Sequence, residues 1–256
     1  MVLHLHEWGE RHAPPVVCLH GVTGHGRRFR RLAEERLASG FRVLAPDLRG
    51  HGFSEWEPPW TIATHVADIL ETLDAFGISR PDWVGHSFGG RLILELAARA
   101  PARLGRVVLL DPAIQVLPHV AFDFAELERA ERVFTSPEQA VDIWAASAPT
   151  TPRAALAADV AEHLEERDGG LRYRYCQSCV VSLYGELAAE PPPPETLRAE
   201  TLLLYSPAFG LVREGQISDY RAALGDRLTV AAIPGGHVLY WDAFDETADA
   251  LDEFLS

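Results

Sequence analysis

The residues best suited to covalent chemistry stand in the segment Gly85-His86-Ser87-Phe88-Gly89, which matches the pattern G-x-S-x-G. An apolar run precedes this segment and a helical pattern follows it, and this context is what gives the pattern meaning. A serine at a sharp strand-to-helix turn has a strained backbone, and flanking glycines leave the space that a Cβ would fill. Its hydroxyl would project from the sheet edge, where a helix N-terminus favours developing negative charge. Ser87 is therefore the candidate nucleophile; the alternative is a plain glycine-rich turn.

Two further loops could assist this hydroxyl. Residues 234–237 stand between the last expected strand and the last expected helix, so His237 is the candidate base that takes the serine proton. Residues 20–26 follow an early apolar strand, and their glycines would let backbone N–H groups turn inward. The amides of Val22 and Phe88 would then form an oxyanion hole. The competing interpretations are a solvated loop histidine and a flexible loop. A nucleotide site is disfavoured, because no P-loop or dinucleotide-binding glycine pattern is present.

Alternating strand and helix patterns would position these loops. Short, continuous apolar runs are typical of parallel strands covered on both faces, and here they alternate with amphipathic helical stretches. The pattern predicts an α/β fold with an open, mostly parallel, doubly wound sheet. The expected strands are residues 3–8, 16–19, 41–45, 82–86, 106–110, 201–205 and 228–233, and the expected helices are residues 26–38, 61–76, 87–100, 214–224 and 243–255.

The alternation is interrupted by residues 113–198, which have no clear strand and contain helical segments rich in alanine and glutamate. Four consecutive prolines at 191–194 predict a stiff, extended connector back to the core. We therefore expect a core of residues 1–112 and 199–256, with residues 113–198 as a helical cap over the carboxyl edge of the sheet. The cap's aromatic residues could wall an apolar pocket or build the cap's own core; they are Phe122, Phe124, Phe134, Trp144, Tyr173, Tyr175 and Tyr184.

These motifs together resemble the cap-bearing serine esterase branch of the α/β-hydrolase family, as do the stretches at residues 45–54 and 109–113. The resemblance covers about residues 3–112 and 200–256 and implies the α/β-hydrolase fold, although the family's first strand looks absent or very short. The haloalkane dehalogenase and epoxide hydrolase branches carry aspartate where Ser87 stands, so those activities are not expected. When the family's roles are carried over position by position, the resemblance implies that Ser87 is the nucleophile and His237 the base. It also implies that Val22 and Phe88 are the oxyanion donors, and that His20 and Asp47 shape the loops.

The acid of the expected triad does not stand where the family usually has it. The family places it in the loop after the strand at 201–205, where this chain has Phe209 and no carboxylate before Glu214. We predict that Asp111 replaces it. A right-handed strand-helix-strand unit sets the strand of Asp111 beside that of Ser87, about 4.8 Å away. Glu214 and a dyad without any acid are the alternatives, and Asp111 could also be an ordinary turn residue.

Composition limits the partners of this chain. Lysine and arginine number 23 against 37 aspartates and glutamates, giving a formal net charge of −14. Nucleic acid and anionic membrane surfaces would be repelled by that charge. Three cysteines do not make a disulfide framework, and the C-x-x-C of Cys176 and Cys179 is expected to lie on one helix face without a metal. With no leader pattern and no apolar run of about 18 residues, we expect a cytoplasmic protein, monomeric or homodimeric.

The sequence thus favours a serine hydrolase that cleaves small carboxylic esters through an acyl-enzyme, using a Ser-His-Asp triad and no metal or organic cofactor. Lactonase, thioesterase and carbon–carbon bond hydrolase activities use the same machinery and stay open. A different class also stays open. The absence of the usual acid could mark a degenerate member that only binds a small ligand.

Overall fold

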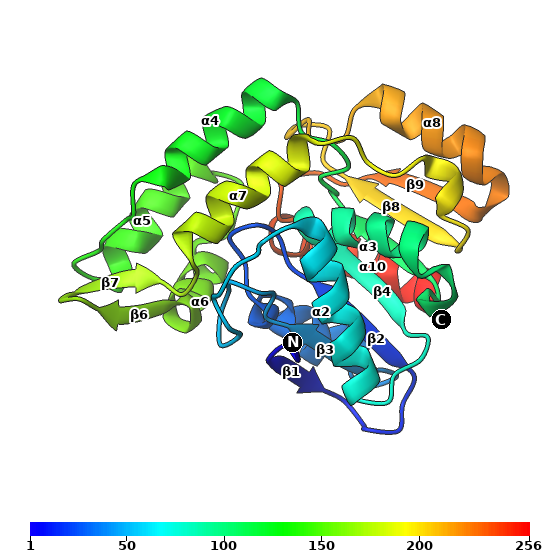
Figure 1. The fold of residues 1–256 in the computed structure, drawn as a ribbon, viewed down its shortest axis with the longest axis horizontal. Coiled ribbons are helices and arrows are strands. Elements are labelled where there is room, and N and C mark those ends of the chain that lie inside the picture. Colours follow the sequence, from blue (N-terminus) through cyan, green and yellow to red (C-terminus); the bar gives the residue numbers. More distant parts are fainter.

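A seven-stranded sheet forms the centre of the computed structural model, which describes residues 1–256 (Figure 1). The strand order is β1-β3-β2-β4-β5-β8-β9; β1 pairs antiparallel with β3, and every other neighbouring pair is parallel. The prediction of a mostly parallel sheet is confirmed. The strands are β1 (Leu5–Trp8), β2 (Pro15–Leu19), β3 (Arg42–Pro46), β4 (Asp82–His86), β5 (Val107–Leu110), β8 (Thr201–Tyr205) and β9 (Leu228–Ala232).

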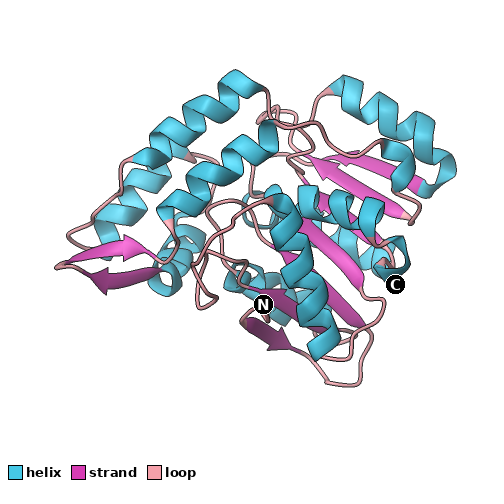
Figure 2. Ribbon diagram, viewed as in Figure 1, coloured by secondary structure: helices cyan, strands magenta, loops and turns pink.

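Helices cover both faces of this sheet, which explains why the central strands are apolar without alternation (Figure 2). Along β5, Leu109 belongs to the apolar cluster on one face, while Val108 and Leu110 belong to the cluster on the other. The first cluster includes residues of α2 (Ile62–Ala75), α3 (Phe88–Arg99) and α8 (Glu214–Leu224), and the second includes residues of η1 (Gly26–Phe29), α1 (Arg30–Leu32), η2 (Ala33–Leu37), α9 (Leu239–Asp242) and α10 (Phe244–Leu255).

One expected helix differs in detail from the structure, and one short helix is present that was not expected. The single helix expected at 26–38 is divided into 3-10, α and π segments. The short helix α9 precedes α10 and was not expected, because its four residues are too few for a periodic apolar pattern.

Between β5 and β8 the chain leaves the sheet and forms a layer at the end of the sheet where the parallel strands finish (Figure 1). We call residues 113–198 the cap. Its helices α4 and α7 pack against each other, as do α5 and α6. The cap elements are α4 (Pro118–Arg129), α5 (Pro137–Ser147), α6 (Arg153–His163), β6 (Leu164–Arg167), β7 (Gly170–Tyr173), α7 (Gln177–Ala188) and η4 (Pro194–Thr196). Two further short 3-10 helices belong to the core: η3 (Pro101–Arg103) and η5 (Gly225–Arg227).

The expectation that this segment has no strand was wrong, because β6 and β7 form an antiparallel hairpin. Asp168 and Gly169 form its turn with φ values of 50° and 74°. Aspartate followed by glycine is a strong signal for a two-residue hairpin turn. The flanking strands have only four residues each and no face that is fully buried, so their apolar pattern was weak.

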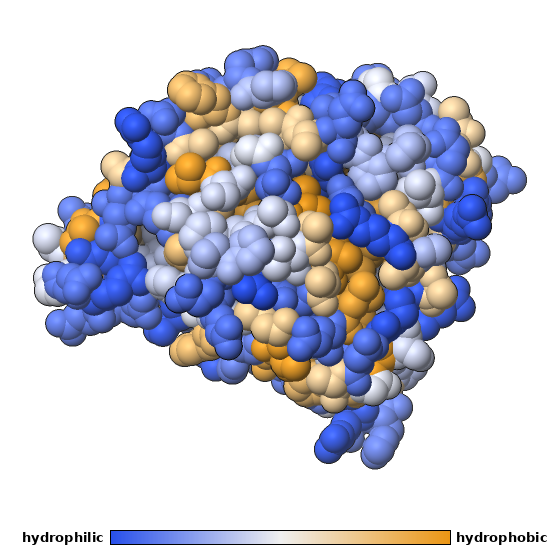
Figure 3. Space-filling model, in the orientation of Figure 1, coloured by the Kyte–Doolittle hydropathy of each residue, from blue (hydrophilic) through white to orange (hydrophobic).

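The surface mixes charged and apolar side chains. Figure 3 shows apolar residues exposed among hydrophilic ones over α4, where Phe122 and Leu127 are both exposed. No helix combines the length and the apolar character needed to cross a bilayer. The three cysteines are free. Cys176 stands just before α7 and Cys179 inside it.

Candidate active site

Ser87 occupies a strained turn between β4 and α3. Its φ of 52° and ψ of −114° lie in a region that non-glycine residues rarely adopt. Glycine is required on both sides of this turn. A Cβ on Gly89 would lie 2.1 Å from the carbonyl oxygen of Leu19, and one on Gly85 would lie 2.7 Å from the carbonyl oxygen of Gly89. The two glycines of the G-x-S-x-G pattern are thus explained by close packing, of Gly89 on β2 and of Gly85 on the first turn of α3.

Asp111 and His237 form the second part of the site. The Nδ1 atom of His237 lies 2.6 Å from Oδ2 of Asp111, which is completely buried. Asp111 follows β5 directly, and β5 lies beside β4 with Leu110 opposite His86. The sheet register therefore brings the carboxylate to the edge that carries Ser87. Glu214, which the sequence offered as an alternative to Asp111, is exposed at the start of α8 and makes no hydrogen bond or ion pair with His237.

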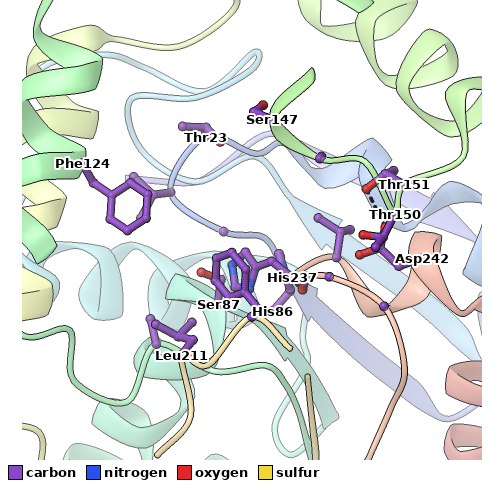
Figure 4. Close-up of a pocket in the computed structure, with 18 of the residues that line it drawn as sticks. Thr23, His86, Ser87, Phe124, Ser147, Thr150, Thr151, Leu211, His237 and Asp242 are labelled. Atoms are coloured by element: carbon purple, nitrogen blue, oxygen red, sulfur yellow. Dashed lines mark hydrogen bonds between the residues drawn. The ribbon is translucent and has the colours of Figure 1, made fainter. Parts of the chain in front are cut away.

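Ser87 and His237 face one cavity of about 370 Å³ beneath the cap (Figure 4). Its walls include Phe124 and Ser147 from the cap and Val22 from the core. The side chain of His237 is 24% exposed, so the imidazole is accessible from the cavity while its Nδ1 is held by the buried carboxylate. Nε2 of the ring has no hydrogen-bond partner within the protein.

The loop after β2 approaches the serine closely. A Cβ on Gly21 would lie only 3.2 Å from Cβ of Ser87, so this loop passes close to the Ser87 side chain. The backbone N–H of Val22 donates to no acceptor within the protein, and Phe88 is the first residue of α3, where an N–H has no acceptor within its own helix. Nε2 of His51 lies 2.5 Å from the carbonyl oxygen of Val22 and fixes the orientation of the next peptide unit. Two free amides near a nucleophile can stabilise an oxyanion.

His20 and Asp47, the residues expected to shape loops, are both fully buried. Nε2 of His20 accepts a hydrogen bond from the amide of Leu48, and its Nδ1–H donates to the carbonyl oxygen of Gly21. Burial alone would raise the pKa of Asp47. Hydrogen bonds, of which the strongest comes from His6, instead hold its pKa well below the usual range. Neither residue lines the cavity.

Ser206 is a supporting residue that the sequence analysis missed. Its backbone N–H donates to Oδ1 of Asp111 at 3.1 Å, and its hydroxyl donates to the carbonyl oxygen of Gly235 at 2.6 Å. The same hydroxyl accepts from the amide of Phe209 at 3.2 Å. Ser206, in the loop after β8, thereby connects the loop of Asp111 with the loop of His237. Its position directly after a core strand was the one available signal.

Phe209 and His86 hold His237 from two sides. The Phe209 ring stacks on the His237 ring with centroids 4.4 Å apart and planes 16° from parallel. Nε2–H of His86 donates to the backbone carbonyl oxygen of His237 at 3.0 Å. Burial lowers the pKa of His86 well below its usual value, so this histidine is neutral near pH 7. An aromatic ring therefore occupies the position where the resemblance led us to look for an acid.

Two other groups of side chains bring metal-ligating atoms within 4.8 Å of one another. In the group of His4, His6 and Asp47, the carboxylate already accepts hydrogen bonds from an imidazole and two backbone amides. In the second group, Asp159 forms an ion pair with Arg28 through both oxygens. Because both carboxylates have protein partners, neither group offers a free anionic ligand for a cation.

Comparison with known proteins identifies the family. A family model described as the alpha/beta hydrolase fold matches residues 14–172, more than half of the chain. The chain belongs to the α/β-hydrolase family. It shares 35% identity over 208 residues with Lipase LipV of Mycobacterium tuberculosis, covering 78% of this chain and 77% of that protein. It shares 32% identity over 99 residues with Esterase YbfF of Escherichia coli, covering 39% of each.

Solved α/β-hydrolase structures agree with this assignment at the level of the fold. E-2-(acetamidomethylene)succinate hydrolase superposes with a TM-score of 0.90 at 21% identity, covering 99% of this chain and 94% of that one. An enol-lactonase from Burkholderia xenovorans LB400 superposes with a TM-score of 0.80 at 22% identity, covering 99% and 96%. The prediction of the α/β-hydrolase fold is confirmed, and family membership supports hydrolase activity.

Proposed function

We propose that this α/β hydrolase cleaves carboxylic esters through an acyl-enzyme formed on Ser87. One observation carries the proposal. A serine in a strained turn and a histidine paired with a buried carboxylate at 2.6 Å face the same cavity. A histidine held in this way has the tautomer and the electrostatic partner that a general base needs.

The reaction begins when the hydroxyl of Ser87 attacks the ester carbonyl carbon and Nε2 of His237 takes its proton. The amides of Val22 and Phe88 stabilise the oxyanion. The imidazolium then gives its proton to the departing alcohol, leaving the acyl group on the serine. Water activated by His237 attacks this acyl group and releases the acid. In both halves of the reaction Asp111 holds the Nδ1–H and stabilises the imidazolium.

A lipase and an esterase are among the relatives, and their names support an oxygen ester as the first substrate class to test. The lipase match covers 78% of this chain and 77% of that protein, and the esterase match covers 39% of each. The solved structures named for lactone or thioester chemistry are below 25% identical and support only the fold. Small carboxylic esters are therefore the first substrates to test, ahead of lactones and thioesters.

The test measures hydrolysis of 4-nitrophenyl butyrate by the wild-type protein and by Ser87→Ala. We expect the substitution to lower kcat by about 10³-fold or more, because it removes the nucleophile. Ser182→Ala, which changes an exposed serine on α7, is the matched control and should keep full activity. Equal turnover by wild-type and Ser87→Ala protein would refute the proposal.

A further inference from the structure

The cavity at Ser87 adjoins a second lobe of about 240 Å³ that lies beneath the cap, away from the nucleophile. Ser87 and His237 line only the first lobe, whereas residues of the cap and of the loop after β2 line both. The shared residues are Thr23, Arg28, Phe124, Trp144, Ser147 and Tyr184. The two lobes therefore lie next to each other beneath the cap and share part of their wall.

Aromatic side chains form much of the wall of this second lobe. Phe124 and Tyr184 are stacked with centroids 5.5 Å apart and planes 15° from parallel, and Tyr173 and Tyr175 are stacked at 5.7 Å and 18°. Trp144 meets Tyr173 edge to face at 6.3 Å. All five rings line the lobe. Flat, quadrupolar walls favour an aromatic guest over an aliphatic one of equal size.

The aromatic side chains of the cap differ in their exposure and in whether they line the two lobes. Phe134 is 2% exposed, belongs to the buried apolar core and lines neither lobe. Phe124, by contrast, is 36% exposed and lines both lobes. Phe122 is 65% exposed and lines neither. Tyr175 is buried in the core and also lines the second lobe, so the cap contains a core ring, an outer ring and a set of rings that border open space.

Hydrogen-bond donors without partners stand among the aromatic walls. The hydroxyls of Tyr173 and Tyr184 bond to no protein group, and burial raises the pKa of Tyr173 to about 12, so it stays protonated. The buried Arg28 uses Nε and Nη2 on Asp159 and leaves Nη1 without a protein partner. Pockets with a few such donors select ligands that bring matching oxygen acceptors.

We propose that the second lobe binds an aromatic ring bearing an oxygen substituent, which forms the acyl or the alcohol part of the ester substrate. The proposal rests on the ester hydrolysis proposed above. Space permits it, because a closed cavity of about 150 Å³ already admits benzene, and this lobe measures about 240 Å³.

The kinetic test compares methyl 3-(4-hydroxyphenyl)propanoate with methyl 3-cyclohexylpropanoate, and 2-(4-hydroxyphenyl)ethyl acetate with 2-cyclohexylethyl acetate. Nitrophenyl esters are avoided, because their leaving group is itself an aromatic ring. Acid release is followed with a pH indicator. We expect the phenolic ester to exceed its cyclohexyl partner by about tenfold in kcat/KM in at least one pair. Ratios near one in both pairs would overturn the proposal.

Variants connect this preference to the lobe. Tyr184→Leu removes one ring face and one hydroxyl from the wall of the lobe, and should bring the ratio of phenolic to cyclohexyl ester close to one. Phe122→Leu, which changes an exposed ring of α4 outside both lobes, should leave the ratio unchanged. A ratio that survives Tyr184→Leu would contradict the assignment.

A binding experiment separates this proposal from the proposed function. Phenol and cyclohexanol are titrated by calorimetry into Ser87→Ala protein, which cannot turn over an ester. We expect phenol to bind about tenfold more tightly than cyclohexanol, and Tyr184→Leu to abolish the difference. If phenol binds in this way but no ester is hydrolysed, the proposed function fails and the aromatic subsite stands. If esters are hydrolysed but phenol shows no preference, only the subsite fails.

Discussion

The carboxylate of Asp111 lies directly after β5, and this position decides how the imidazole of His237 is held. One oxygen of the carboxylate meets Nδ1 of His237, and the other accepts the backbone N–H of Ser206. Because the group is completely buried, both oxygens depend on these partners and the carboxylate has little freedom to move. In the proposed mechanism this carboxylate is the acid of the triad, and it comes from the strand next to that of Ser87.

We predict that Asp111→Asn lowers kcat for an ester substrate by about 10³- to 10⁴-fold, because the imidazole loses its orienting and charge-stabilising partner. Glu214→Gln should retain wild-type kcat, since Glu214 is exposed and has no contact with His237. The two variants are compared on one ester at saturating concentration. The opposite pattern, with Glu214→Gln inactive and Asp111→Asn active, would transfer the role of the acid to Glu214.

A residue's place in the site could be predicted from the sequence where the order of neighbouring strands in the sheet determines that place. Asp111 could be proposed because β4 and β5 must be neighbours and end at the same edge. Ser206 and Phe209 could not be proposed, because their roles depend on the path of a loop whose bends are set by tertiary contacts. The sequence shows that position 209 is a phenylalanine and not a carboxylate, but it does not show that the Phe209 ring stacks on His237.

At the scale of elements, the turn between β4 and α3 depends on the contact between that turn and β2. Gly89 lies so close to the carbonyl of Leu19 that no side chain fits between them. The strained conformation of Ser87 therefore requires the whole strand-turn-helix unit to be packed on its neighbour. Strain of this kind persists only where the surroundings enforce it.

Gly89→Ala should lower the free energy of unfolding by about 3 kcal/mol or more, because its Cβ would clash with rigid backbone. Gly185→Ala is the matched change, since Gly185 lies inside α7 with no atom within 4 Å of its added Cβ. That change should raise the free energy of unfolding by about 0.5–1 kcal/mol. Urea denaturation measures both. Equal effects of the two substitutions would show that Gly89 is not constrained by packing.

The order and type of the core elements could be predicted because buried parallel strands and amphipathic helices have distinct periods. The cap was harder. Its hairpin β6–β7 has short strands without a buried face, and its one clear signal was the Asp168-Gly169 turn. The segmented helix at 26–37 also could not be read from periodicity, because π and 3-10 turns depend on local packing.

At the scale of the whole molecule, a buried polar cluster joins the cap to the core. Arg28 and His25 come from the core and Asp159 and His163 from the cap helix α6. Nε2 of His25 lies 2.9 Å from Asp159, and Arg28 pairs with both oxygens of the same carboxylate. Neither ring nitrogen of His163 has a hydrogen-bond partner. Burial and the neighbouring His25 lower the pKa of His163 to about 3.

This cluster predicts that acid destabilises the protein. Between about pH 6.5 and pH 3 the unfolded chain binds a proton at His163 that the folded protein cannot bind, so the free energy of unfolding falls as the pH falls. The contribution of His163 approaches about 1.4 kcal/mol per pH unit in this window. His163→Phe keeps an aromatic ring beside Tyr173 and Tyr175 and should make the dependence between pH 6.5 and pH 5 shallower by about that amount.

Urea denaturation at several pH values measures this dependence. His119→Gln, at an exposed position on α4, is the control and should leave the pH dependence unchanged. An identical slope for His163→Phe and wild type would show that His163 is not the group responsible.

The most direct measurement of the central claim is the intact mass of the protein after reaction with a fluorophosphonate, followed by peptide mapping. We predict one added phosphonyl group, located on Ser87, and no label on Ser87→Ala or on wild-type protein pre-incubated with a slowly hydrolysed ester. Absence of label on the wild-type protein, or label on any other residue, would contradict the claim that Ser87 is an activated nucleophile.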